Sequence, residues 1–256
     1  MQESVMRIRR DRDGDVLVLT LDYPARRNAL AMPLRRELEE ALEEAAESGV
    51  RAVVLTGAEG HFCSGGDISG MDVRGLLEGR ERMRRTHRLV RLMAFGGMPL
   101  VAAVEGWCVG AGLSLACLCD TVIAGEDARL AAGFGKIGLM ADLGLAFTLP
   151  QRVGVAKARQ LLLYHRQLSA AEALAIDLVD EVVPTGQALT VALERARFLA
   201  EQAPAPLALT RQMLAQGLHE ALEMERHFQA ALFATADFRE GRQAFLEKRP
   251  PRFSGG

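Results

Sequence analysis

Two glycine-rich stretches and one isolated aspartate have the residue types that suit chemistry at a carbonyl group. Gly110 and Gly112 flank Ala111 just after a short apolar run, and a helix that begins near Gly112 leaves N–H groups without intrahelical partners. Such N–H groups lie at the positive end of the helix dipole and stabilise an oxygen that becomes negative during a reaction. A tight strand-to-helix turn with glycines for packing explains the same pattern, so this stretch alone leaves both interpretations open.

The second stretch, residues 62–67 (FCSGGD), offers another backbone N–H, at Ser64, before two glycines. Asp142 is the single carboxylate in the apolar segment 134–149. Two N–H donors and one acid would form an oxyanion hole with a general base, an arrangement that can enolise a thioester. Asp142 also suits the N-cap of a helix over 143–149, and this structural alternative stays open.

Three other patterns favour ordinary structure over chemistry. Residues 112–116 lack the last glycine of a Gly-x-Ser-x-Gly nucleophile elbow, and the preceding strand ends near Val104 instead of directly before Ser114. The arginine-rich helix expected over 75–95 has no interleaved aromatic residues, which indicates a solvated face or a subunit contact and no nucleic-acid site. The cysteines form no Cys-x-x-Cys pair and have no histidine at zinc-like spacing, so we expect reduced thiols and no metal site; they are Cys63, Cys108, Cys117 and Cys119.

Length and composition are those of a globular protein. The 256 residues suffice for one large domain or a domain with an appendage, and 49% of them are hydrophobic and 25% charged. The formal net charge of −2 gives no global field that favours nucleic acid or membrane. No apolar run approaches the roughly 18 residues of a membrane span, and no apolar signal core follows the first basic residues. These features predict a cytoplasmic protein.

Hydrophobic periodicity predicts an α/β core followed by a helical C-terminal arm. Strands are expected at 16–21, 51–56, 100–104, 121–124 and 179–183. Helices are expected at 33–48, 75–95, 113–118, 154–164, 169–177, 186–202, 206–218, 220–236 and 238–247.

Five segments together resemble the crotonase (enoyl-CoA hydratase/isomerase) superfamily, in order along residues 16–253; they are 26–30 (RRNAL), 62–67, 105–112 (EGWCVGAG), 119–120 (CD) and 245–249 (FLEKR). The resemblance implies a spiral of strand-strand-helix turns over 1–195 and a helical trimerisation region over 196–256. It also implies a homotrimer or a homohexamer. The substrate would be an acyl-CoA thioester, with coenzyme A as part of the substrate and no separate cofactor.

The same resemblance assigns roles to individual residues. The oxyanion hole would be formed by the N–H groups of Ser64 and Ala111. The coenzyme A contacts would be made by Arg26, Ser64, Gly65, Gly66, Asp67, Ile68 and Lys248.

Two departures from the family pattern favour one reaction over another. Ser114 and Phe134 stand where hydratases of this family carry glutamates, and neither side chain can deprotonate a water molecule. Asp142 remains, in a segment that resembles the oxepin-forming ring-epoxyphenylacetyl-CoA isomerases and some enoyl-CoA isomerases, where one aspartate shuttles the proton. Leu139 and Leu143 would desolvate this carboxylate and raise its pKa. We therefore expect an isomerase, with an enoyl-CoA hydratase, an acyl-CoA thioesterase and a non-catalytic CoA- or RNA-binding homologue as alternatives.

The helical tail carries apolar positions that a lone domain would struggle to cover. They predict a subunit contact along these helices. The positions are Leu214, Leu218, Leu222, Phe228, Leu232, Phe233 and Phe238.

Overall fold

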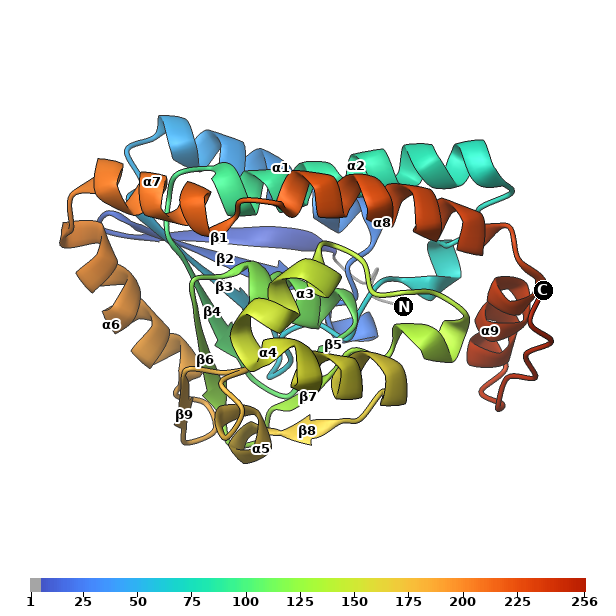
Figure 1. The fold of residues 1–256 in the computed structure, drawn as a ribbon. Helices are drawn as coiled ribbons and strands as arrows, with labels where there is room; N and C mark the ends of the chain where they lie inside the picture. Colours follow the sequence, from blue (N-terminus) through green and yellow to red (C-terminus); the bar gives the residue numbers. More distant parts are fainter. Residues whose placement is uncertain (1–5) are drawn as a thin grey trace.

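Two β-sheets form the centre of the chain in the computed structural model, which describes residues 6–256 (Figure 1). The larger sheet has the strand order β1-β2-β3-β4-β6-β9; β1 pairs antiparallel with β2, and the other neighbours pair in parallel. The smaller sheet has the order β5-β7-β8. The strands are β1 Arg7–Asp13, β2 Val16–Asp22, β3 Ala52–Gly57, β4 Leu100–Val104, β5 Trp107–Val109, β6 Thr121–Gly125, β7 Arg129–Ala131, β8 Leu168–Ser169 and β9 Glu181–Val183.

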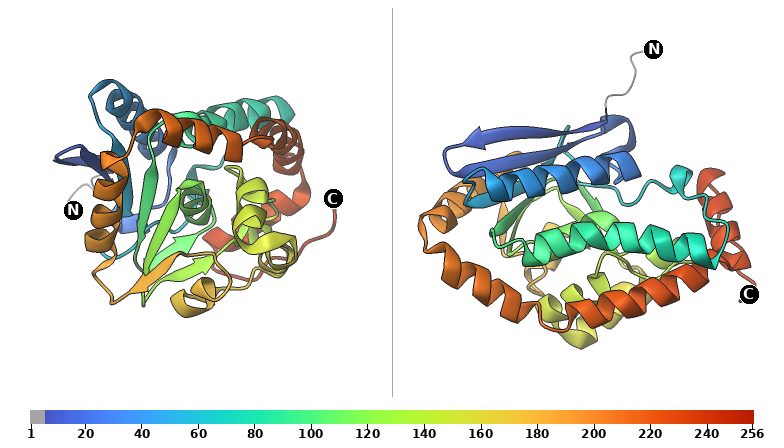
Figure 2. Two further views of the ribbon diagram at one scale, coloured as in Figure 1. Left: turned by 60° about the vertical axis from the view of Figure 1, so that its left-hand side comes forward. Right: turned by 90° about the horizontal axis from the view of Figure 1, so that it is seen from above.

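Helices cover both faces of the larger sheet (Figure 2). The helices are α1 Met32–Glu47, α2 Leu76–Phe95, α3 Ala111–Leu118, α4 Leu145–Tyr164, α5 Ala170–Leu174, α6 Ala188–Glu201, α7 Pro204–Leu214, α8 Leu218–Phe233 and α9 Ala236–Leu246. On one face, α6 packs through small residues that recur every four positions, which lets the helix lie close to the valines of β2, β3 and β4. These small residues are Ala188, Ala192, Ala196 and Ala200.

The opposite face holds the main core and the long helices. α1, α2 and α8 lie beside one another, and α8 packs along the length of α2 (Figures 1 and 2). α9 lies at the far end with the C-terminus and packs against the short 3-10 turn Phe134–Ile137. This arrangement encloses the segments that carry Asp142 and the two glycine-rich loops.

The expected α/β fold with a helical C-terminal region is confirmed, and the differences lie in short or charged elements. The sequence did not reveal β1, because its pattern RIRRDRD is almost wholly exposed and charged, as suits an edge strand. β5 lies inside the stretch that we expected to be a turn, and α4 begins at Leu145 and continues across a break at Gly154. No helix among residues 6–256 is both long enough and apolar enough to span a bilayer.

Two expectations about the C-terminal part need adjustment. The division after residue 195 stays a prediction, but it falls inside α6, whose last two alanines still pack on the sheet. Of the seven apolar tail residues, four lie in the chain's own core, so their expected place in a subunit contact is wrong: Leu218, Leu222, Phe233 and Phe238. Leu214 and Phe228 are exposed.

Candidate active site

The two glycine-rich loops are locked together by backbone pairing. Cys63 N–H donates to the carbonyl of Trp107 at 2.8 Å, and Val109 N–H donates to the carbonyl of Cys63 at 2.9 Å. Cys63 thus forms a parallel bridge with Cys108. Gly112 is required at this contact, because a Cβ there would lie 2.3 Å from the Cys63 carbonyl oxygen.

This pairing brings two unused N–H groups to one cavity. Three residues further along each segment stand Gly66 and Ala111, and both line the same cavity. Ala111 is the first residue of α3, where no intrahelical acceptor exists for its N–H. Within residues 6–256, neither N–H donates to a backbone or side-chain acceptor. Gly66 and Ala111 can therefore donate together to one oxygen atom of a ligand.

The expectation that Ser64 supplies the first of these donors is wrong. Its N–H donates to the carbonyl of Arg27 at 3.0 Å, and its hydroxyl donates to the carbonyl of Arg26 at 2.8 Å. The glycine-rich composition revealed that this loop exposes its backbone. It could not show which N–H stays free, because that depends on contacts with distant segments, here the loop that carries Arg27.

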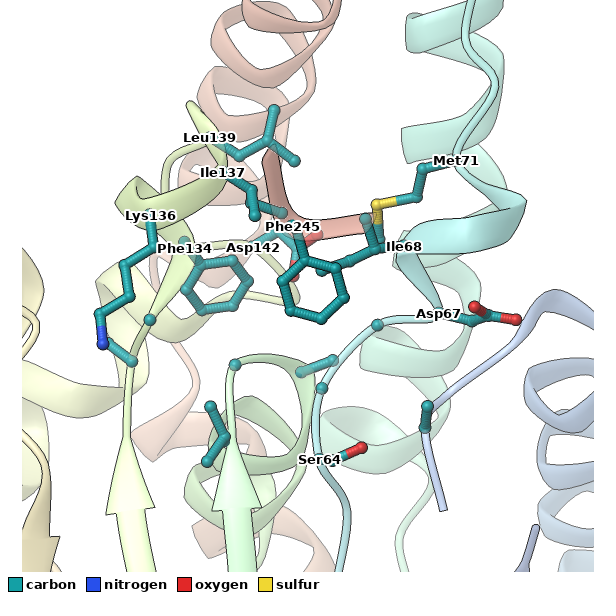
Figure 3. Close-up of a pocket in the computed structure, with 18 of the residues that line it drawn as sticks. Ser64, Asp67, Ile68, Met71, Phe134, Lys136, Ile137, Leu139, Asp142 and Phe245 are labelled. Atoms are coloured by element: carbon teal, nitrogen blue, oxygen red, sulfur yellow. The ribbon is translucent and has the colours of Figure 1, made fainter. Parts of the chain in front are cut away.

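The expected coenzyme A residues meet at the cavity, except one. Lining residues include Arg26, Ser64, Gly65, Gly66, Asp67 and Ile68. The Asp67 carboxylate is engaged by the Ser69 N–H at 3.1 Å and the Ser69 hydroxyl at 2.6 Å, and it points away from the cavity (Figure 3). Lys248 is exposed just beyond the end of α9 and does not line the cavity. The contacts of all these residues with coenzyme A stay predictions.

Asp142 lies within this cavity of about 430 Å³. In Figure 3 the rings of Phe134 and Phe245 stand before it. Its Oδ1 atom is shielded from solvent and has no hydrogen-bond partner among residues 6–256. Burial raises the pKa of Asp142 to about 6 and the Glu225 charge acts in the same direction, against the opposing effect of nearby arginines.

Asp142 does not cap a helix. α4 starts at Leu145, its N-cap residue is Gly144, and no side chain makes a capping hydrogen bond there. The capping alternative is therefore wrong. Leu143, between Asp142 and the cap, adopts a positive φ of 55°, an unusual conformation for a leucine in a segment that carries a buried carboxylate.

Two buried polar residues of α8 hold the Asp142 segment on both sides. Glu225 accepts the Gly144 N–H through Oε2 at 2.9 Å. Gln229 accepts the Met140 N–H at 3.2 Å and donates to the Met140 carbonyl at 3.1 Å. Because both residues lie on one face of a helix that packs along α2, the position of Asp142 depends on the main core.

Further contacts complete this support from α2 and α3. His87 Nε2 lies 2.9 Å from Glu225 Oε1. Burial raises the pKa of Glu225 to about 7 and lowers the pKa of His87 to about 4, so the imidazole is neutral at neutral pH. The hydroxyl of Ser114 donates to the Asp142 carbonyl at 2.9 Å, which turns this side chain away from any ligand.

The sequence-based prediction missed the polar residues that surround Asp142. Arg35, Glu225 and Gln229 occupy positions on otherwise apolar helix faces, and all three are buried. A polar residue that interrupts the apolar stripe of an amphipathic helix was the available signal. Arg82 had no such signal, because it stands among several arginines of α2, of which Arg84 and Arg85 are exposed.

Comparisons with known proteins agree with this fold and site. The family model described as enoyl-CoA hydratase/isomerase matches residues 11–256. A probable enoyl-CoA hydratase of Rhodobacter capsulatus is 38% identical, over 97% of this chain and 98% of its own. A 1,2-epoxyphenylacetyl-CoA isomerase of Escherichia coli is 35% identical, over 94% of this chain and 95% of its own.

A solved structure extends the agreement to the whole fold. An enoyl-CoA hydratase from Mycobacterium avium subsp. paratuberculosis superimposes with a TM-score of 0.86 at 32% identity, covering 96% of this chain and 98% of the other. The chain belongs to the enoyl-CoA hydratase/isomerase family. Its cavity, with two free N–H groups and a buried acid, is consistent with an enzyme that acts on acyl-CoA thioesters.

Proposed function

We propose that this enzyme is an acyl-CoA isomerase that moves a double bond, or rearranges an epoxidised ring, through a thioester enolate. The observation that carries the proposal is how few carboxylates line the described cavity. Asp142 and Asp67 are the carboxylates among the cavity-lining residues within 6–256, and Asp67 is engaged by Ser69 and points outward. One acid/base suits isomerisation, because the proton removed from one carbon is returned to another.

The proposed reaction begins when the thioester oxygen accepts hydrogen bonds from the N–H groups of Gly66 and Ala111. Asp142 removes a proton from C2 of a 3-enoyl-CoA, and the electron pair moves into a dienolate whose negative oxygen these donors stabilise. The protonated Asp142 then returns the proton to C4. The double bond moves to position 2, and the enzyme ends in its starting state.

Hydration is the rival reaction, and relatives of both kinds are similar to this chain. Adding water requires groups that hold and deprotonate the water molecule. Ser114 has its hydroxyl on the Asp142 carbonyl, and Phe134 presents a ring to the cavity. Both features support the isomerase over the hydratase.

The substrate would be held by its coenzyme A moiety along Arg26 and residues 64–68, with Lys248 reaching a phosphate. A buried oxyanion hole needs no metal or separate cofactor for enolisation, so we propose none. Trimeric or hexameric assembly belongs to the same proposal.

The test is to incubate the purified enzyme with 3-enoyl-CoA and 2-enoyl-CoA in parallel and to follow isomer, hydrate and free coenzyme A. We expect isomer from the first substrate and no hydrate from the second. Hydrate as the main product would establish the hydratase instead, and free coenzyme A would establish a thioesterase. Unchanged substrates in both reactions would favour a binding protein.

A further inference from the structure

A buried guanidinium without an ion-pair partner lines the cavity near Asp142. Arg35, on α1, is only 3% exposed. Its Nη1 donates to the hydroxyl of Thr86, but its Nε is buried without any partner. Within residues 6–256, no carboxylate forms an ion pair with it. Burial lowers the pKa of Arg35 to about 10, and nearby carboxylates offset this only in part.

A second guanidinium, that of Arg82 on α2, lines the same cavity. Arg82 lies one helical turn before Thr86, the residue that binds Arg35, and both residues line the cavity. In the described part of the chain Arg82 makes no hydrogen bond and no ion pair. Burial lowers its pKa, and Asp142 is the charge that most opposes this shift, as it is for Arg35.

The carboxylates nearby leave positive charge in excess. Asp142 is one negative charge facing two arginines. Asp67 is engaged by Ser69, and Glu39, the other carboxylate near Arg35, lies 3.8 Å from Arg88. Glu78, a further carboxylate near Arg82, is exposed to solvent and accepts the Arg74 N–H at 2.9 Å. A buried arginine is rarely left unpaired, because an uncompensated charge costs several kcal/mol. The cavity is therefore built to receive an anion.

We infer that Arg35 and Arg82 bind a carboxylate on the acyl group, so that the substrates are coenzyme A thioesters of dicarboxylic acids. The inference rests on the proposed use of this cavity for an acyl-CoA. The planar guanidinium matches a carboxylate through two parallel hydrogen bonds. Both arginines line the cavity together with Asp142, which places the anion on the side of the reacting carbons, whereas Arg26 and residues 64–68 line the part expected to hold coenzyme A.

The test measures binding without turnover. Succinyl-, glutaryl- and adipyl-CoA are titrated by calorimetry, each against the saturated thioester in which an isopropyl group replaces the terminal carboxylate. We expect at least one dicarboxylic thioester to bind about 10- to 100-fold more tightly than its isopropyl counterpart, the usual gain from charged hydrogen bonds. Arg35→Met and Arg82→Met should each reduce this ratio toward one, and Arg35→Lys should retain part of it.

Arg36→Met is the matched control, because Arg36 is the exposed neighbour of Arg35 on α1, and it should leave the ratio unchanged. If Arg35→Met does not fold, Arg82→Met, at a partly exposed position, provides the same measurement. Equal affinity of the wild type for every charged and uncharged pair would overturn the inference, as would equal loss of both probes in the arginine variants. Failure of coenzyme A and every thioester to bind would contradict the proposed function as well.

Discussion

Asp142 owes its suitability as a base to burial. With a pKa of about 6, it is ionised at neutral pH and is a stronger base than an exposed aspartate. The same shift affects stability with a definite sign. The folded chain binds the proton more tightly than the unfolded chain does, so stability falls as pH rises from about 4 to about 6 and is level above that range.

Replacing Asp142 with asparagine tests both consequences. Asp142→Asn should lower isomerase turnover by roughly 10²- to 10⁴-fold, the usual contribution of general acid–base catalysis. The variant should also melt at a higher temperature than the wild type near pH 8, where it relieves a buried charge, and the difference should shrink near pH 4. Steady-state kinetics and calorimetric melting at both pH values measure these effects.

The wild-type enzyme provides the control for this prediction. Its activity should fall as pH decreases through about 6, because Asp142 then becomes protonated. Wild-type turnover in Asp142→Asn would rule out the single-aspartate mechanism, and a large loss of melting temperature at pH 8 would indicate a structural role instead.

The site residues differ in how well their roles could be predicted from the sequence. Asp142 was identifiable because it is the one carboxylate in an apolar segment. Ser64 was misassigned because its N–H donates to the carbonyl of Arg27 in a distant loop, and such a contact leaves no local sign in the sequence. Arg35 and Arg82 converge from different helices, and no spacing within either helix reveals such convergence.

The first turn of α3 positions one of the two donors to the substrate oxygen. Ala111→Pro removes that N–H at the first helical position, where proline fits without breaking the helix. Turnover should fall on the order of 10²-fold or more, because one oxyanion donor is lost. Ala111→Gly keeps the N–H and should retain most of the turnover. Similar kinetics of the two variants would place the oxyanion hole elsewhere.

α8 positions the acid from the other side, through Gln229. Gln229→Leu leaves the Met140 N–H and carbonyl without their partner, and should lower the free energy of unfolding by about 1–3 kcal/mol. Turnover should fall as well, under conditions where the variant is fully folded, because the Asp142 segment loosens. Urea unfolding and steady-state kinetics measure the two effects.

The control for the α8 prediction is Gln243→Leu, at an exposed position of α9. It should change stability and turnover little. A destabilised Gln229→Leu enzyme with normal turnover would show that α8 supports the fold without positioning the acid.

The elements themselves were predictable where a strong period or an apolar run marks them. The helices α1, α2 and α6 and the buried strands β2, β3, β4 and β6 all lie close to their expected ranges. Short elements such as β5 and β7 were missed, because three residues carry no periodicity. β5 and β7 are defined by their pairing with each other. β5 also pairs with the loop that carries Cys63, so it helps to position the site.

At the scale of the whole molecule, the order of the family segments was enough to predict the spiral. The burial of individual residues in the C-terminal helices could not be predicted in the same way. Apolar residues there divide between two faces. One face packs on α2 and the core, and the other remains exposed. The sequence shows only that both faces are apolar.

The exposed apolar face predicts assembly. Met213 and Leu214 on α7 are 77% and 69% exposed, and Phe228 on α8 is 53% exposed. Exposed apolar side chains of this size on two consecutive helices favour a subunit interface. Sedimentation velocity should therefore show a trimer or a hexamer at micromolar concentration.

The Met213→Glu/Leu214→Glu double variant should dissociate toward monomers, because a desolvated carboxylate is costly in an interface. Gln212→Glu, which adds a charge at a neighbouring exposed position, should remain assembled. A monomeric wild-type protein would contradict the prediction.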